Sequence, residues 1–181
     1  MDRFIMISGC SGGGKSTLLA ELKRRGHAVV EEPGRRIIAE ETGGKGLALP
    51  WVDLAAFAKR AIAMALDDRR RAQALTGPVF FDRGLVDAAV ALHHATGEPF
   101  LPICIRERYN PVIFMAPPWP ELYRSDEKRR HGLEEAIAEY ERLILAYRSL
   151  GYRIALLPKA SLSARADTIV RHATTFSLSP R

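Results

Sequence analysis

The amino-acid sequence predicts an α/β fold in which helices cover both faces of a parallel β-sheet. Strand-like and helix-like segments alternate along all 181 residues, which is the pattern of such a sheet. The candidate strands are largely apolar, as expected for strands buried on both faces. A glycine-rich loop joins the first candidate strand to the first candidate helix. Because the length is that of one domain, we expect a single domain over residues 1–181.

Five segments rich in β-branched and aromatic residues are predicted strands, each bounded by glycine, proline or charge. In chain order they are Phe4–Ser8, Ala28–Glu31, Val79–Asp82, Val112–Ala116 and Tyr152–Leu157. The runs Phe4-Ile5-Met6-Ile7 and Val112-Ile113-Phe114-Met115 contain no polar residue. These two strands are therefore expected to be buried on both faces of the sheet.

Six further segments are predicted helices. They are Lys15–Arg25, Arg35–Glu41, Trp51–Leu75, Val86–Thr96, Leu133–Leu150 and Leu162–Phe176. Apolar residues recur at steps of three and four within Leu133–Leu150, so one stripe of this helix should face a core. Gly151 follows directly, where a C-terminal helix cap belongs.

The composition indicates a globular protein with a basic surplus. Hydrophobic residues make up 47% of the chain, enough to bury a sizeable core. Lysine and arginine total 27 against 21 acidic residues, a net charge of +6. This surplus suits phosphate-bearing ligands. Nucleic acid stays possible as a partner but is not favoured, because no basic stripe with interleaved aromatic residues is visible.

The sequence predicts a cytoplasmic location. Only two cysteines occur, Cys10 and Cys104, too few for the disulfide framework of small secreted domains. The apolar runs are far shorter than the ~18 residues that a membrane-spanning helix needs. The first residues lead straight into a strand-like segment and not into a signal peptide. No membrane association is expected.

The glycine-rich loop has the pattern of a phosphate-binding loop, or P-loop. Residues 9–17, GCSGGGKST, match G-x-x-x-x-G-K-[ST] between a strand and a helix. The glycines let successive N–H groups converge on a phosphate at the positive end of the helix. Lys15 is expected to reach the β- and γ-phosphates of ATP, and the Ser16 hydroxyl to bind Mg²⁺. The expected nucleotide-binding residues are Gly9, Gly12, Gly13, Gly14, Lys15, Ser16 and Thr17.

The third predicted strand ends in an acid-arginine pair. Asp82 is positioned to be the second anchor of the metal, so Ser16 and Asp82 are the expected metal ligands. Motor ATPases commonly place a glutamate after this aspartate to position water, but here Arg83 follows. An arginine favours holding a second anionic group or a substrate over hydrolysis. The alternative is a surface ion pair.

The second predicted strand ends in two carboxylates and a proline. Phosphoryl transfer to a hydroxyl needs a carboxylate within hydrogen-bond reach of the acceptor proton. Glu32 is the candidate base, with Pro33 fixing the chain direction just after it. Since Glu31 and Glu32 point to opposite faces of a strand, at least one of them is expected to face water. The alternative is an acidic turn without a catalytic role.

A basic segment, residues of about 118–132, lies between the fourth predicted strand and the following helix. Its composition is typical of a lid. Phosphoryl-transfer sites need mobile cations that close over the nucleotide and exclude water. Arg124, Arg129 and Arg130 are the candidates. The alternative is a solvated helix end whose acids and bases neutralise one another.

These motifs, in this order, resemble those of small P-loop kinases, the deoxynucleoside kinase and thymidylate kinase group. The chain is more closely similar to a bacterial group of AAA-domain ATP-binding proteins related to nicotinamide riboside kinase domains. The matching motifs are Glu32-Pro33-Gly34-Arg35, Pro50-Trp51, Asp82-Arg83-Gly84 with Asp87, Pro118-Trp119, and Gly151-Tyr152 with Leu157-Pro158. Deoxynucleoside kinases have a serine where this chain has Gly84.

The resemblance implies a three-layer α/β/α P-loop NTPase whose five parallel strands lie in the order 2-3-1-4-5. It also implies ATP with Mg²⁺ at the P-loop, and an acceptor cleft between Glu32, Asp82 and the helix after Trp51. The turn Pro158–Ser161 should then pass near the adenine.

The first functional hypothesis is a kinase that moves the γ-phosphoryl group of ATP to a nucleoside, a nucleotide or a similar small acceptor. Its expected catalytic residues are Lys15, Glu32, Asp82, Arg83, Arg124 and Arg129. The alternatives are a regulatory ATP-binding protein or ATPase without such an acceptor, and a polynucleotide kinase. The sequence leaves open the acceptor, the choice between ATP and GTP, and the oligomeric state.

Overall fold

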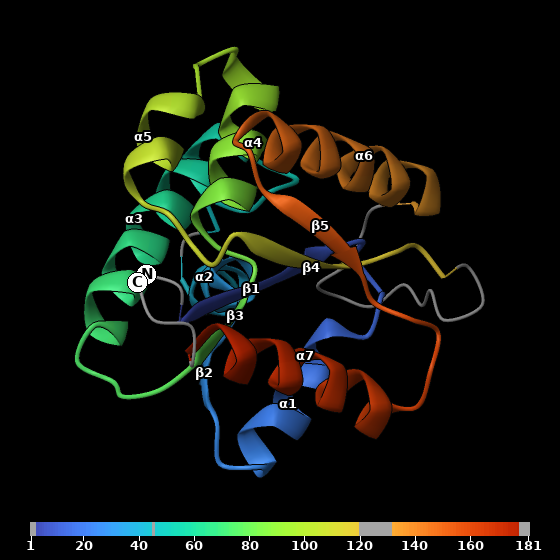
Figure 1. Ribbon diagram of the computed structural model, residues 1–181. Coiled ribbons are helices and arrows are strands. Elements are labelled where there is room, and N and C mark those ends of the chain that lie inside the picture. The colour runs from blue at the N-terminus through green and yellow to red at the C-terminus, as the bar shows by residue number, and fades with distance from the viewer. Residues whose placement is uncertain (1–2, 45, 120–131, 178–181) are drawn as a thin grey trace.

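The computed structural model describes residues 3–44, 46–119 and 132–177. A five-stranded sheet, in the order β2-β3-β1-β4-β5, forms its centre (Figure 1). All four neighbouring strand pairs are parallel. The strands are β1 (Phe4–Gly9), β2 (Ala28–Val30), β3 (Val79–Asp82), β4 (Val112–Ala116) and β5 (Arg153–Leu156). The predicted fold class and strand order are confirmed.

Helices form a layer on each face of the sheet (Figure 1). They are α1 (Lys15–Arg24), α2 (Pro33–Thr42), α3 (Leu54–Ala72), α4 (Leu85–Thr96), α5 (Leu101–Arg106), α6 (Leu133–Ser149) and α7 (Leu162–Ser177). The pair α1 and α7 covers one face, whereas α3, α4 and α6 cover the other, with α2 packed on α3.

The two faces of β1 explain why its sequence has no polar residue between Phe4 and Ile7. Ile5 and Ile7 lie in the core shared with α1 and α7. Phe4 and Met6 lie in the core shared with α3, α4 and α6. Successive side chains of a strand point to opposite faces, so a strand covered on both sides needs an apolar residue at every position.

Two helix starts differ from the prediction by two or three residues, and one short helix was not predicted. The helix predicted from Trp51 begins at Leu54, because the Asp53 side chain caps it by accepting from the Ala56 N–H at 2.8 Å. The helix predicted from Arg35 begins at Pro33, which suits the first turn because proline lacks the N–H group that would be unsatisfied there. Helix α5 was not predicted, since six residues are too few to show a helical period.

The register of the sheet brings the carboxyl ends of three strands together. Ile7 of β1 pairs with Asp82 of β3, and Gly9 pairs with Ala116 of β4. The P-loop therefore leaves the sheet between the ends of β3 and β4. Among the described helices, none is both long and apolar enough to cross a membrane.

Candidate functional site

The P-loop leaves β1 in close contact with the end of β4. A Cβ atom on Gly9 would lie 2.3 Å from the carbonyl oxygen of Ala116, so only glycine fits there. The Cys10 N–H donates to the same carbonyl at 2.8 Å. Gly14, the last residue before α1, has a φ of 69°, in the left-handed region that favours glycine. These glycines let the loop curve around the amino end of α1.

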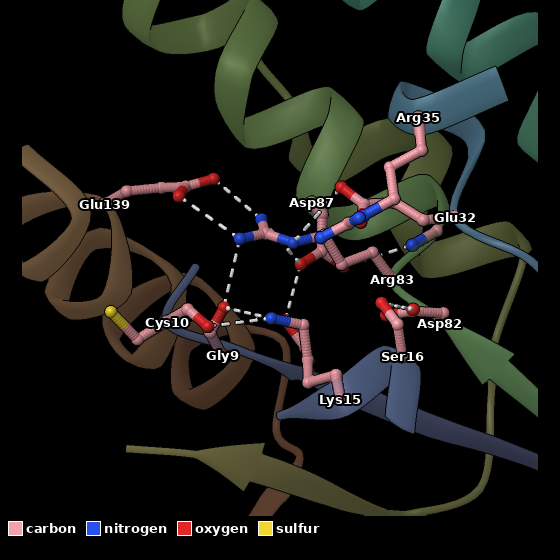
Figure 2. A network of polar contacts seen from close by, with 12 residues as sticks. Gly9, Cys10, Lys15, Ser16, Glu32, Arg35, Asp82, Arg83, Asp87 and Glu139 are labelled. Carbon is pink, nitrogen blue, oxygen red and sulfur yellow. Dashed lines mark hydrogen bonds and ion pairs between the residues drawn. The ribbon is translucent and has the colours of Figure 1, made fainter. Parts of the chain in front are cut away.

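The Lys15 side chain folds back into the P-loop and binds the backbone at its start. It is buried, and its Nζ donates to the carbonyl oxygens of Gly9 at 3.2 Å and Cys10 at 2.8 Å (Figure 2). Burial, followed by the positive charge of Arg83, lowers the pKa of Lys15, while Asp82 and other nearby acids oppose this shift. The loop thus carries a cation at its centre.

Ser16 and Asp82 bring oxygen donors together beside the loop. The Ser16 Oγ donates to the Asp82 Oδ2 at 3.2 Å, and the Asp82 Oδ1 is buried without a hydrogen-bond partner among the described residues. Burial, followed by the negative charge of Glu32, raises the pKa of Asp82 to about 6. A hydroxyl and a carboxylate with an unused oxygen fit the oxygen coordination of Mg²⁺.

Arg83 turns back from β3 toward the P-loop. Its φ of 53° is the one positive value at a non-glycine position in the described part of the chain. The Nη1 donates to the Glu139 Oε1 at 2.6 Å, and the Nη2 donates to the Gly9 carbonyl at 3.0 Å (Figure 2). This unusual backbone conformation aims the side chain across the end of the sheet.

Three carboxylates surround the Arg83 guanidinium. Glu139 pairs with it at 2.6 Å, Asp87 lies at 3.6 Å and Glu32 at 3.7 Å. Burial acts in the opposite direction, but the charges of these three acids hold the pKa of Arg83 well above its ordinary value. The sequence predicted Arg83 as a ligand for an anion; in the structure the charge of Arg83 is already matched by acids of the protein. Glu139 carried no sequence motif that could have pointed to it.

Glu32 lies in the site, whereas Glu31 lies at the surface. Glu32 is the N-cap residue of α2, yet its side chain makes no capping bond. Its Oε2 accepts from the Arg35 Nε at 3.1 Å. The Glu31 side chain is 70% exposed and pairs with Lys23. The short β2 strand thus places one carboxylate toward the P-loop side and sends the other to solvent.

Gly84 and Asp87 fill the space behind Arg83. A Cβ on Gly84 would lie 2.7 Å from the Tyr109 hydroxyl oxygen, so any larger residue at this position would require a neighbouring side chain to shift. Asp87 is buried, accepts from the hydroxyls of Ser8 and Tyr147, and accepts from the Gly84 N–H at 3.2 Å. Burial raises the pKa of Asp87.

One cavity of about 630 Å³ connects the P-loop with a chamber between α2, α3, α4 and α6. At the P-loop end it is lined by Gly12, Gly14, Lys15, Ser16, Thr17 and Arg165. In the chamber it is lined by Glu32, Ile38, Leu54, Phe57, Ala88 and Arg142. The cavity therefore has room for a second small molecule beside a ligand of the P-loop.

The structure brings most of the predicted site residues to this cavity. Lys15, Ser16, Thr17, Glu32 and Arg83 line it, whereas Asp82 does not line it but is hydrogen-bonded to Ser16, which does. The lid predicted over residues 118–132, with Arg124 and Arg129, lies almost entirely outside the described residues and stays a prediction. Sequence reasoning missed Glu139 and Arg165, which no local motif marks.

Comparisons with known proteins give one family and one fold. The profile of a family described as an AAA domain matches residues 4–165. The chain is similar to the structure of deoxyadenosine kinase from M. mycoides with the products dCMP and dCDP bound (TM-score 0.63, 15% identity, 96% of this chain and 99% of that chain). It is also similar to shikimate kinase from Acinetobacter baumannii in complex with shikimate (TM-score 0.59, 15% identity, 98% of this chain and 96% of that chain). No curated protein matches the sequence.

Proposed function

The chain belongs to the AAA domain family, and from this premise we propose that it is a small-molecule kinase. It would transfer the γ-phosphoryl group of ATP to a nucleoside, a nucleotide or a similar acceptor. The observation that carries the proposal is the continuous cavity, in which the P-loop opens into a chamber with Glu32 in its wall. Hydrolysis of ATP does not require a second chamber beside the phosphate site, whereas transfer to an acceptor does.

The P-loop would hold the phosphates of ATP. Its N–H groups lie at the positive end of α1, where phosphate binding is favoured. Lys15 would exchange its two backbone carbonyl partners for oxygens of the β- and γ-phosphates. In this position it would stabilise the negative charge on the transferred group.

Ser16 and Asp82 would hold Mg²⁺ when ATP binds. Their oxygens lie 3.2 Å apart, and the second carboxylate oxygen of Asp82 is free of hydrogen bonds within the described ranges. Bound there, the ion would neutralise charge on the phosphates. Ser16 and Asp82 therefore set the orientation of the terminal phosphate relative to Glu32.

Glu32 would act as the base for the acceptor. Its carboxylate would take the proton from the acceptor hydroxyl while the hydroxyl oxygen forms a bond to the γ-phosphorus, with ADP as the leaving group. Arg83 contacts both the Gly9 carbonyl and, at 3.7 Å, Glu32. It would thus position the base relative to the P-loop. The apolar side chains of Ile38, Leu54 and Phe57 would keep water away from the γ-phosphate.

The direct test is a screen of nucleosides, nucleotides and vitamins as acceptors for labelled ATP. We expect one class of acceptor to increase ATP consumption sharply, and Lys15→Ala to abolish the transfer. If ATP binds but no acceptor becomes labelled, the chain is a regulatory nucleotide-binding protein and the kinase proposal fails.

The proposed base gives a sharper prediction. Glu32→Gln should lower the turnover of the best acceptor by ~10²-fold or more, since general base catalysis contributes about this much. The affinity for ATP should stay within about twofold, because the base does not hold the nucleotide. Glu31→Gln is the matched control, as this neighbouring side chain lies at the surface. Equal activity of the two variants would remove Glu32 from the mechanism.

A further inference from the structure

Arg165 of α7 reaches across to the P-loop. Its Nη1 lies 3.2 Å from the position that a Cβ on Gly14 would occupy, so the guanidinium rests directly against the loop. Arg165 also lines the P-loop end of the cavity, together with Lys15 and Thr17. Helix α7 and the P-loop are far apart in the sequence, and the packing of α1 against α7 brings them together.

The guanidinium of Arg165 has no acidic partner among the residues that the structure describes. Its Nε and Nη1 are buried without a hydrogen-bond partner. The contact made by the group is with the ring of Trp119, whose centroid lies 5.3 Å from the guanidinium carbon. Burial alone lowers the pKa of Arg165, with no charge opposing it.

Two other arginines in the described part of the chain that have a buried nitrogen without a partner show how unusual this is. Arg36 and Arg69 also have one buried nitrogen without a partner. Each of them is nevertheless ion-paired through other nitrogens, Arg36 with Asp68 and Arg69 with Glu107. The Arg165 side chain is only partly buried, but its two inner nitrogens have neither an acid nor a hydrogen-bond acceptor within the described ranges, which is unfavourable unless a ligand supplies one. At a P-loop, that ligand is an anion.

We propose that Arg165 is a nucleotide-binding residue that donates to a phosphate group held by the P-loop. The inference rests on the proposed function only in requiring a nucleoside di- or triphosphate at residues 9–17. A guanidinium forms strong, directed hydrogen bonds with phosphate oxygens. The indole face of Trp119 keeps the guanidinium in position before the nucleotide arrives. Besides Lys15, the sequence predicted cations that contact the nucleotide in the lid segment. Arg165 would supply a further such cation from α7.

Calorimetry with ATP, ADP and inorganic tripolyphosphate tests this role without any acceptor. Arg165→Ala should weaken the binding of all three by about tenfold or more, the effect of losing a hydrogen bond to a charged group. Arg165→Lys should retain part of the affinity, because it keeps the charge but loses the planar donor group. Arg70→Ala controls for net charge, since Arg70 is an exposed partner of Asp67 on α3, and should bind all three ligands like the wild type.

Thermal unfolding separates binding from a structural role. Without ligand, Arg165→Ala should unfold at the same temperature as the wild type or higher, because it removes two buried nitrogens that have no hydrogen-bond partner among the described residues. Its stabilisation by saturating ADP should be smaller than that of the wild type. A lower melting temperature with unchanged affinities would overturn the proposal, and so would a loss of ATP binding with unchanged tripolyphosphate binding, which would indicate contact with the base.

These outcomes are distinct from failure of the kinase proposal. A wild-type protein that binds ATP but phosphorylates no acceptor contradicts the kinase proposal alone. A wild-type protein and an Arg165→Ala variant that bind all three phosphates equally contradict the Arg165 proposal alone. A wild-type protein that binds none of them overturns both.

Discussion

At the scale of single residues, Arg83 shows how one side chain organises the site. Its left-handed backbone directs the guanidinium to the Gly9 carbonyl and to three carboxylates. Such a conformation costs roughly 1–2 kcal/mol at a non-glycine residue. The ion pairs and hydrogen bonds around Arg83 offset that cost and tie the P-loop to α6.

Gly84 gives a test of close packing behind Arg83. Gly84→Ala should lower the free energy of unfolding by about 1–3 kcal/mol, the usual cost of overpacking, because the new methyl group meets the Tyr109 hydroxyl oxygen. In a Tyr109→Phe background the same substitution should cost less, since that oxygen is gone. Urea unfolding of the four proteins measures the coupling. Strictly additive effects would show that another contact, such as Met6, limits the space.

The residues that the sequence could reveal are those with a local pattern. The P-loop residues lie in one contiguous motif, and Glu32 and Asp82 each end a predicted strand. Glu139 and Arg165 could not be recognised in this way. Each acts through a contact with a residue far away in the chain, Arg83 and Gly14 respectively, and neither contact leaves a periodic or motif signal.

At the scale of elements, helix starts depend on single capping residues. Asp53→Ala should destabilise the protein by about 1 kcal/mol, because α3 loses the carboxylate that accepts from the Ala56 N–H. Asp53→Asn should retain nearly all of the stability, since asparagine is an equally good cap. Thermal or urea unfolding of both variants gives the comparison. Equal losses in the two variants would mean that the charge matters and not the cap.

Periodicity predicted α6 closely, whereas α3 is three residues shorter at each end than predicted and the short helix α5 was missed. The boundaries of α6 differ from the predicted Leu133–Leu150 by one residue, because a clear apolar stripe and Gly151 mark that helix. Helix α5 was missed, as it spans six residues and buries few side chains. Strand β2 is one residue shorter than predicted, because the chain turns at Glu31 to begin α2.

At the scale of the whole molecule, the strand order was predictable from the family resemblance and not from the strands themselves. Apolar runs indicate that a strand is buried but not which strands are its neighbours. The resemblance to P-loop kinases supplied the order, and the observed pairing of β1 with β3 agrees with it. The side chains of the acceptor chamber come from α2, α3, α4 and α6, so no short stretch of sequence describes its shape.

Buried acids make the global stability depend on pH. The pKa of Asp82 is raised to about 6, so the folded protein holds this proton more tightly than the unfolded chain does. The resulting stabilisation is full below the unfolded pKa of about 4 and is lost as the pH rises through 6. Asp82→Asn should therefore be more stable than the wild type at pH 8, by about 1–3 kcal/mol, with less difference near pH 4.

Urea unfolding of both proteins between pH 4.5 and 8 measures this difference. Burial also raises the pKa of Asp87. Because Asp87 is present in both proteins, its titration contributes equally to both free energies of unfolding and does not affect their difference. Asp53→Asn serves as the control at an exposed carboxylate. A constant difference between Asp82→Asn and the wild type across this range would show that Asp82 does not titrate there.

The central place of β1 has a consequence for synthesis on the ribosome. Strand β1 is flanked by β3 and β4, which both follow it in the chain, so its second neighbour, Val112–Ala116, emerges much later. Until then the nascent chain has an unpaired, apolar strand edge, of the kind that promotes aggregation. Translation that stalls before Val112 would release a fragment unable to complete its sheet, and we expect such fragments to depend on chaperones.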